Sequence, residues 1–297
     1  MSLDLSRYLE ERRALVDAAL ERCLPPEDAP PPSVHRAMRY SVLAPGKRLR
    51  PILVIAGAEA VGGRAETVLD TACALELVHV YSLIHDDLPA MDDDDYRRGR
   101  LTSHKVFGEA VAILAGDALL TLAFGLIAGS AGRTADPALA ARVVAEVAEA
   151  AGTRGMVGGQ VVDIESEGKD VGAETLDYIH LHKTAALIRV SLRAGALLGG
   201  GQDEAVEAVS EAGRALGLAF QIVDDILDVE GNLAELGKCA GSDERKKKAT
   251  YPACHGLDAS KRKARMLIDD TKRRLSPLGP AAAPLLALGD FVIERRS

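Results

Sequence analysis

Apolar positions recur every three to four residues along most of the chain, which is the period of an amphipathic helix. Glycine, proline and polar clusters separate these stretches, and no stretch alternates strictly enough between apolar and polar residues to indicate a strand. The pattern therefore predicts an all-α protein. The expected helices cover residues 3–24, 33–43, 51–60, 66–88, 106–129, 136–151, 173–199, 203–229, 258–275 and 281–295.

Two proline-rich segments interrupt the helical pattern near the N-terminus. The stretch "PPEDAPPP" at residues 25–32 predicts a stiff connector, because proline fixes φ and lacks a backbone donor. The stretch "APGKRLRP" at residues 44–51 breaks the next helix at Pro45 and Gly46. No composition break divides the remaining length, so we expect one domain over residues 1–297.

The composition favours a helical protein of the cytoplasm. Tryptophan is absent, and the four cysteines lack metal-ligand spacing, which argues against a zinc site or a disulfide framework and suits a reducing compartment. The charged N-terminal segment lacks the apolar core of a signal peptide. The net charge of −8 disfavours sequence-independent binding to nucleic acid, so an anionic ligand would have to be held locally.

One stretch, residues 111–128, is apolar enough to resemble a membrane span. Asp117 lies at its centre, where a charge costs about 2.5 to 3.5 kcal/mol on insertion. We therefore expect a central helix of a large core and no membrane span.

Two apolar helical stretches end in paired aspartates. In the first, "HDDLPAMD", Pro89 should break the helix and return Asp92 to the side of Asp86. In the second, "VDDILD", Asp224 and Asp228 project from one helix face about 5.4 Å apart. One acidic run alone is usually a solvated helix end. Two matched runs suit a diphosphate bridged by Mg²⁺, which takes oxygen ligands from carboxylates and phosphates.

Two groups of basic residues accompany the carboxylates. The turn "GKRLRP" supplies Lys47, Arg48 and Arg50, and "YRRGR" supplies Arg97 and Arg98 just past the first aspartates. Either group alone is explained equally well as solvated surface. Together they predict a second anion site that needs no metal, because arginine forks match phosphate oxygens.

Taken in order, these motifs resemble those of the trans-polyprenyl diphosphate synthases, most closely the bacterial farnesyl diphosphate synthase type. The resemblance covers nearly the whole chain and rests on "GKRLRP", "SLIHDDLPAMDDDDYRRG", "GGQVVD", "HKTAALIR", "GLAFQIVDDILD" and "LGKCAGSDERKKKATYP". It implies a single-domain, isoprenoid synthase-type helical bundle around a central cavity, with two aspartate-rich motifs at its mouth. It also implies a homodimer and a Mg²⁺-dependent transferase that condenses isopentenyl diphosphate with dimethylallyl or geranyl diphosphate to give (E,E)-farnesyl diphosphate.

The resemblance assigns a role to each group of motif residues. The carboxylates expected to bind Mg²⁺, and through it the allylic diphosphate, are Asp86, Asp92 and Asp224, supported by Asp87, Asp163, Asp225 and Asp228. The residues expected around the allylic diphosphate and the reacting carbons are Arg97, Lys183, Thr184, Gln221, Lys238 and Lys248. The residues expected at the isopentenyl diphosphate site are Lys47, Arg50, His79 and Arg98, with Arg295 and Arg296 helping to close it. The catalytic residues are expected to be Lys183, Thr184, Gln221, Asp86, Asp87 and Asp224.

The chemistry implied by the resemblance needs both anion sites. Breaking the allylic carbon–oxygen bond leaves an allyl cation and diphosphate, so donors and metal are needed where negative charge grows. The second diphosphate site holds isopentenyl diphosphate so that its double bond meets the cation.

The length of the product should depend on the residues below the first aspartates. Tyr81 lies five residues before Asp86, about 7.5 Å along a helix, which suits a floor for the growing chain. An aromatic residue there resembles the farnesyl type. Ser82 lies more nearly beneath Asp86 in helical phase, however, so geranylgeranyl diphosphate remains an alternative product.

Three other classes of protein share parts of the pattern. A terpene cyclase of the same fold would not need a separate site for isopentenyl diphosphate. A helical metal phosphohydrolase would need more histidine ligands than His85 beside Asp86, and the second cluster offers only aspartates. A regulatory subunit would be expected to lose an aspartate cluster, and both clusters are present.

Overall fold

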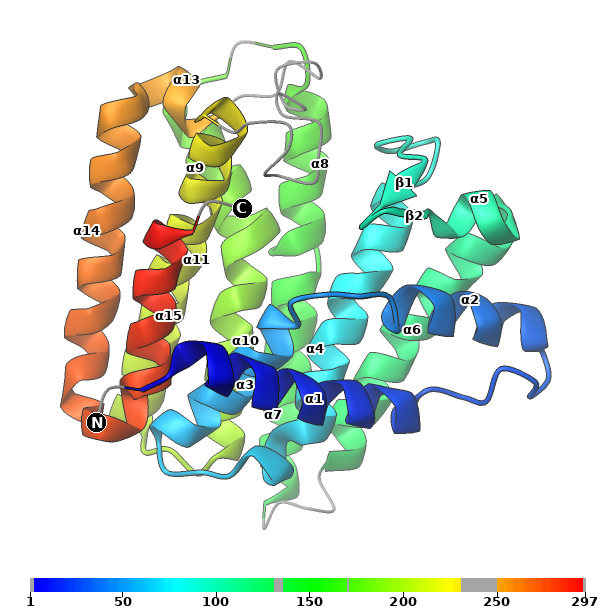
Figure 1. The fold of residues 1–297 in the computed structure, drawn as a ribbon, viewed down its shortest axis with the longest axis horizontal. Coiled ribbons are helices and arrows are strands. Elements are labelled where there is room, and N and C mark those ends of the chain that lie inside the picture. Colours follow the sequence, from blue (N-terminus) through cyan, green and yellow to red (C-terminus); the bar gives the residue numbers. More distant parts are fainter. Residues whose placement is uncertain (1–2, 131–135, 170, 231–249, 296–297) are drawn as a thin grey trace.

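The computed structural model describes residues 3–130, 136–169, 171–230 and 250–295, and it is an all-α bundle, as predicted (Figure 1). The helices are α1 (Leu5–Cys23), α2 (Pro32–Val42), α3 (Leu49–Ala60), α4 (Ala65–Asp86), α5 (Ser103–Phe107), α6 (Glu109–Gly129), α7 (Pro137–Ala151), α8 (Met156–Ser166), α9 (Ala173–Ile179), the π-helix η2 (His180–Ala185), α10 (Ala186–Leu198), α11 (Asp203–Glu230), α13 (Tyr251–His255), α14 (Leu257–Leu275), the 3₁₀ helix η3 (Ser276–Ala282) and α15 (Ala283–Glu294). Strands β1 (Tyr96–Arg97) and β2 (Arg100–Leu101) form an antiparallel ladder.

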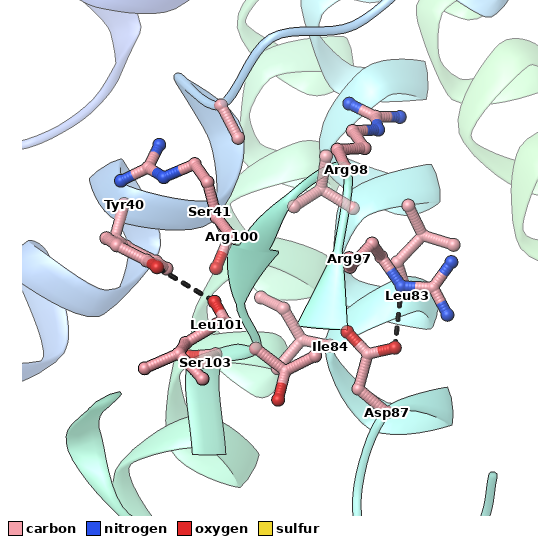
Figure 2. Close-up of a pocket in the computed structure, with 13 residues that line it drawn as sticks. Tyr40, Ser41, Leu83, Ile84, Asp87, Arg97, Arg98, Arg100, Leu101 and Ser103 are labelled. Atoms are coloured by element: carbon pink, nitrogen blue, oxygen red, sulfur yellow. Dashed lines mark hydrogen bonds and ion pairs between the residues drawn. The ribbon is translucent and has the colours of Figure 1, made fainter. Parts of the chain in front are cut away.

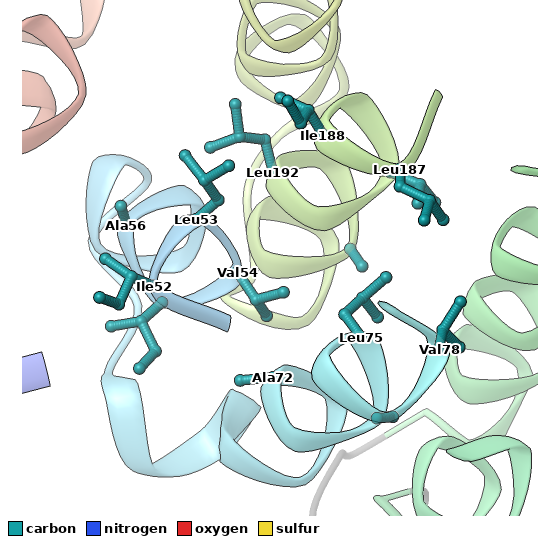
Figure 3. Packing of buried hydrophobic residues seen from close by; sticks show 14 of the residues in the cluster. Ile52, Leu53, Val54, Ala56, Ala72, Leu75, Val78, Leu187, Ile188 and Leu192 are labelled. Carbon is teal, nitrogen blue, oxygen red and sulfur yellow. The ribbon is translucent and has the colours of Figure 1, made fainter. Parts of the chain in front are cut away.

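The core forms around α4, which contacts α3, α6 and α10, while α10 also contacts α11. Leucines from three of these helices meet in a fully buried layer, among them Leu53, Leu75 and Leu192 (Figure 3). Full burial of a leucine side chain stabilises a fold by about 1.5 to 3 kcal/mol. This layer therefore fixes α3, α4 and α10, the helices that lead into the candidate site.

Glycines allow α3 and α10 to approach backbone to backbone. A Cβ at Gly57 would collide with the carbonyl of Leu192, and a Cβ at Gly195 would collide with the carbonyl of Val54. Any larger residue would force these helices apart.

The structure differs from the predicted helices in several places, including the short helices α5 and α13, which were not predicted as separate elements. The expected helix over residues 173–199 is divided into α9, η2 and α10, and the π-helix carries the "HKTA" motif. Helix α8, which carries "GGQVVD", was not predicted because its glycines resemble a break in the pattern. The ladder at β1 and β2 was also not predicted, because two residues per strand are too few for an alternating pattern.

Three helical stretches in the described part of the chain are long and apolar enough to cross a membrane by length and composition: Ala65–Asp86, Glu109–Gly129 and Leu257–Glu294. The apolar window of the first is 72% buried inside the protein and that of the second is 33% buried. The third contains a kink at Gly279, where φ is 65°. High hydropathy in α4 is thus explained by its place in the core.

Candidate active site

The first aspartate cluster forms where α4 ends. Asp86 is the last residue of the helix, and the backbone N–H of Asp92 donates to the carbonyl of Asp86 across 2.8 Å. Pro89 follows the end of the helix, and the chain folds back on itself as predicted. Both aspartates are half-buried. The turn therefore brings Asp86 and Asp92 together despite their out-of-phase spacing.

Asp87, which the resemblance places among the residues supporting Mg²⁺, is paired with an arginine in the structure. Its Oδ1 accepts from Nε of Arg97 at 2.6 Å (Figure 2). Nη2 of the same guanidinium lies 3.5 Å from Asp94 Oδ2. Asp87 is 3% exposed, and burial raises its pKa to about 6, although Arg97 opposes the shift. Asp87 thus holds Arg97, the arginine that the resemblance assigns to the allylic diphosphate.

The second aspartate cluster lies near the C-terminal end of α11. Asp224 is half-buried, and its Oδ1 accepts from Nη2 of Arg295 at 3.0 Å. The same Nη2 donates to the carbonyl of Phe220, and the guanidinium carbon lies 4.0 Å from the centre of the Phe220 ring. Arg295 was expected to close the isopentenyl site. The structure instead places it on the second aspartate cluster.

Asp225, expected to support the metal, turns inward. Its Oδ1 accepts from Gln221 Nε2 at 3.0 Å, and its Oδ2 accepts from the backbone N–H of Tyr251 at 2.8 Å. His180 Nε2 lies 3.3 Å from the same Oδ2. Asp225 is 3% exposed, so its role here is to orient Gln221 and to tie α11 to η2 and α13.

Three motifs distant in sequence meet between α8, η2 and α11. Lys183 on η2 donates from Nζ to Asp163 Oδ2 on α8 at 2.5 Å. Its neighbour Thr184 donates from Oγ1 to Gln221 Oε1 on α11 at 2.8 Å. The wider turn of a π-helix often marks a functional site, and here it carries Lys183 and Thr184 toward two different partners. The structure therefore brings together three residues that were predicted to act together.

The basic cluster lies where the turn before α3 meets α4 and the β1–β2 ladder. Arg50 carries a buried Nε with no hydrogen-bond partner in the described part of the chain, and burial lowers the pKa of Arg50 to about 10. His79 faces Arg50 and Arg98, and burial together with these positive charges holds its pKa well below the usual range. Arg98 donates from Nη1 to the carbonyl of Pro45 at 3.0 Å. Lys47 in the same turn is exposed. This accumulation of positive charge suits a bound anion.

A shallow pocket opens beside this cluster, between α2, α4 and the ladder (Figure 2). Tyr40 closes one side, donating from its hydroxyl to the carbonyl of Leu101 at 2.8 Å, with Arg100 over its ring at 4.1 Å. The rest of the lining is Ser41, Ala44, Val80, Leu83, Ile84, Asp87, Arg97, Arg98, Thr102 and Ser103.

Tyr81 and Ser82, the predicted chain-length residues, lie in α4 below Asp86. Tyr81 is 6% exposed, and its ring meets His85 edge-on with 5.7 Å between ring centres. Ser82 is half-buried and donates from its hydroxyl to the carbonyl of His79 at 2.8 Å. Lys238, Lys248 and Arg296 lie outside the described residues.

Sequence reasoning missed Glu76 and did not foresee the role of Arg48 in the basic cluster. Arg48 was grouped with Lys47 and Arg50, but it is buried in an ion pair with Glu76, with 2.9 Å between Arg48 Nη1 and Glu76 Oε1. Glu76 lies three residues before His79 and so shares its helix face. This spacing could have predicted that Glu76 lies near the basic cluster.

A helical bundle with two aspartate clusters and a separate basic cluster is the arrangement of enzymes that act on isoprenoid diphosphates. The sequence profile of the family described as Polyprenyl synthetase matches residues 31–276. The chain belongs to the polyprenyl synthetase family, and it is a transferase of the prenyltransferase class.

Relatives of known name match over nearly the whole chain. A dimethylallyltranstransferase of Fischerella ambigua is 48% identical over 99% of this chain and 84% of its own length. A geranylgeranyl diphosphate synthase of Cyanophora paradoxa is 44% identical over 100% of this chain and 98% of its own length. Several plant relatives are also named geranylgeranyl pyrophosphate synthases. The crystal structure of a putative farnesyl-diphosphate synthase from Marinomonas superposes with a TM-score of 0.85 at 39% identity, covering 98% of this chain and 100% of that one.

Proposed function

We propose that the protein condenses isopentenyl diphosphate with an allylic diphosphate in a Mg²⁺-dependent reaction that lengthens the prenyl chain by five carbons. The observation that carries this proposal is that α4 contributes both to a basic cluster and to a carboxylate turn. His79 lies among arginines, and Asp86 lies seven residues later in the carboxylate turn. Seven helical residues span about 10.5 Å, so two diphosphates could bind side by side without sharing ligands.

The carboxylate side fits magnesium held jointly with a substrate. No group of three or more His, Cys, Asp or Glu side chains in the described residues is close enough to hold a metal by itself. Mg²⁺ usually keeps several waters and binds one or two carboxylates together with substrate phosphates, so such a group is not required. Asp86, Asp92 and Asp224 would supply the carboxylates. The bound ions would neutralise the charge that grows on the departing diphosphate.

The protein's own groups would control the allyl cation. Lys183, positioned by Asp163, would donate to the allylic diphosphate, and Arg97, positioned by Asp87, would join it. Thr184 and Gln221 would present their oxygens to the cation, because Asp225 fixes the orientation of the Gln221 amide. Arg50, His79 and Arg98 would hold isopentenyl diphosphate with its double bond facing that cation.

The names of the relatives favour geranylgeranyl diphosphate as the product, since most of them specify it. One observation favours farnesyl diphosphate as a second candidate. Tyr81 is a large side chain buried about 1.4 turns below Asp86, where it would stop a growing chain early. The two products differ by one condensation on the same site.

We also propose that the enzyme is a cytoplasmic homodimer with α6 at its interface. Ile113 and Leu114 on this helix are 43% and 58% exposed, and the apolar window of α6 is only one-third buried in a single chain. A second copy that packs on α6 would cover this surface. Light scattering after size-exclusion chromatography should give twice the mass of 31.3 kDa.

The direct test of the function is incubation of the purified protein with Mg²⁺, isopentenyl diphosphate and dimethylallyl diphosphate, followed by mass spectrometry of the products. We expect geranylgeranyl diphosphate, or farnesyl diphosphate if Tyr81 stops the chain, and no product in EDTA. Asp86→Asn and Asp224→Asn should each lower the rate at least a hundredfold, whereas Asp269→Asn on the outer helix α14 should not. Cyclic products, or no elongation with any allylic starter, would overturn the proposal.

A further inference from the structure

Arg48 is held more firmly than either of its basic neighbours. Its side chain is 3% exposed and donates to three groups: Nε to Asp17 Oδ1 at 2.7 Å, Nη1 to Glu76 Oε1 at 2.9 Å, and Nη2 to the carbonyl of Ala44 at 3.0 Å. These partners lie on α1, on α4 and in the turn itself. The guanidinium therefore joins two helices to the turn that carries Lys47 and Arg50.

The backbone of this turn needs such support. Arg48 has a φ of 50°, a left-handed conformation that non-glycine residues adopt only where their surroundings hold them. On the other side, Arg98 donates to the carbonyl of Pro45 and approaches Gly46 so closely that a Cβ there would collide with its guanidinium. The turn is thus fixed between Arg48 and Arg98.

Glu76 is the buried carboxylate that faces this basic cluster. It is 1% exposed, and its negative charge acts on Arg48, Arg50 and Arg98. Of these three arginines, only Arg48 donates a hydrogen bond to Glu76. Within the described part of the chain, Arg50 and Arg98 form no ion pair with a carboxylate. Because Glu76 is bound to Arg48, the other two arginines keep their charge available to an incoming anion.

We propose that Glu76 is a positioning residue for the isopentenyl diphosphate site, acting through Arg48. The Glu76–Arg48 pair fixes the turn so that Lys47 and Arg50 face the diphosphate, and neither member of the pair contacts the substrate. The proposal rests on the proposed function. It gives Arg48 a positioning role and Lys47 and Arg50 a substrate-binding role, although all three belong to one basic motif.

The competing possibility is that Glu76 acts on the substrate only through its charge. A carboxylate in a basic cluster repels a diphosphate, so its removal would then tighten binding. If Glu76 instead positions the turn, its removal weakens binding, because the pair is broken and Arg48 is left buried without its partner. The two possibilities predict opposite signs for the same substitution.

The test is calorimetric titration of isopentenyl diphosphate into the full-length protein in EDTA, where binding needs neither metal nor turnover. We expect Glu76→Gln and Arg48→Gln each to raise Kd at least tenfold. The Kd of the double variant should not exceed the higher of the two single-variant values, because both changes break the same ion pair. In steady-state assays, KM for isopentenyl diphosphate should rise while KM for the allylic diphosphate stays within twofold. Arg193→Gln, which breaks another partly buried arginine pair, with Glu146, is the matched control and should change neither constant.

Asp17→Asn gives a milder version of the test. It removes a half-exposed partner of Arg48 and leaves Glu76 in place, so it applies even if Glu76→Gln does not fold. We expect a Kd about threefold higher. An unchanged or lower Kd in Asp17→Asn and Glu76→Gln would overturn the inference. If the wild-type protein failed to elongate any starter, the proposed function would fail instead, which the product assay shows separately.

Discussion

Arg295 donates from Nη2 to Oδ1 of Asp224 across 3.0 Å, so a residue at the C-terminal end of α15 reaches the second aspartate cluster. The guanidinium is nearly buried, with 6% of its side chain exposed, and it is stacked on Phe220. The positively charged Arg295 is thus already bound to Asp224, a carboxylate that is expected to bind metal. Arg295 and Mg²⁺ should therefore compete for Asp224.

Replacement of Arg295 by glutamine should strengthen metal binding. A hydrogen bond to a charged group contributes about 1.5 to 3 kcal/mol, and partial exposure of Asp224 reduces that, so we expect a threefold to tenfold lower Kd. Mn²⁺ titration followed by electron paramagnetic resonance measures this without turnover. Arg274→Gln, which breaks an ion pair with Asp270 on α14, should leave the Kd unchanged. Weaker Mn²⁺ binding in Arg295→Gln would mean that Arg295 supports the metal site.

Replacement of Tyr81 by alanine should lengthen the product by at least one five-carbon unit. The side chain is buried below the aspartate turn, and its loss leaves room for further condensation. Product lengths are compared by mass spectrometry at equal substrate ratios. Tyr96→Ala, at a tyrosine that is 68% exposed, is the control. The same product from wild type and Tyr81→Ala would exclude Tyr81 as the floor.

Replacement of Thr184 by valine should lower kcat by roughly a hundredfold, the lower end of the loss that follows removal of one oxyanion-hole donor. The change keeps the shape of the side chain but removes the hydroxyl that donates to Gln221. The melting temperature should stay within a few degrees, since one neutral hydrogen bond contributes about 1 kcal/mol. Thr67→Val, at an exposed threonine near the start of α4, tests for a general effect of the substitution.

His79 should make the fold less stable in acid. Its folded pKa lies below the unfolded value of 6.5, so only the unfolded chain gains a proton as the pH falls through 6.5. Its contribution to stability is complete above pH 6.5 and is lost below it, by up to about 1.4 kcal/mol between pH 7.5 and 5.5. Urea unfolding at the two pH values should show this loss reduced in His79→Gln. His255→Gln, at an exposed histidine, should behave as wild type.

Replacement of Gly195 by alanine should destabilise the protein by about 1 to 3 kcal/mol, because the added Cβ meets the carbonyl of Val54 and pushes α10 from α3. The matched control is Gly125→Ala, at a helical glycine where, in the described part of a single chain, no other helix approaches within 4 Å of the place that the methyl group would take. That change should stabilise the helix by up to about 1 kcal/mol. Equal unfolding midpoints in urea for the two variants would contradict the close packing of α3 and α10.

Much of the fold could be predicted from the sequence, because a helix records its buried face in the spacing of its apolar residues. Most helices begin and end within a few residues of the prediction, and the end of α4 was signalled by Pro89. The "GGQVVD" helix and the π-helix were missed. Glycines and a single widened turn leave no distinct period, and contacts with neighbouring helices favour these conformations.

Within the site, the residues by themselves do not distinguish the two members of each aspartate pair. Asp86 and Asp87 are adjacent, as are Asp224 and Asp225, and only the family resemblance assigned the first of each pair to the metal and the second to a supporting role. In the structure Asp87 faces Arg97, and Asp225 accepts from Gln221 and from the backbone of Tyr251. Successive residues of a helix point about 100° apart, so one of each pair faces inward.

The roles of the residues in the basic motif also depend on contacts with residues far away in the sequence. The residue types and spacing were enough to predict an anion site among Lys47, Arg48, Arg50, Arg97 and Arg98. The family resemblance then assigned Lys47, Arg50, His79 and Arg98 to that site. Nothing in the motif predicted that Arg48 would pair with Glu76, 28 residues away, since an ion pair depends on distance through space. The choice between a buried structural arginine and a ligand-binding one depends on which helix packs against the turn, and that is set by the fold as a whole.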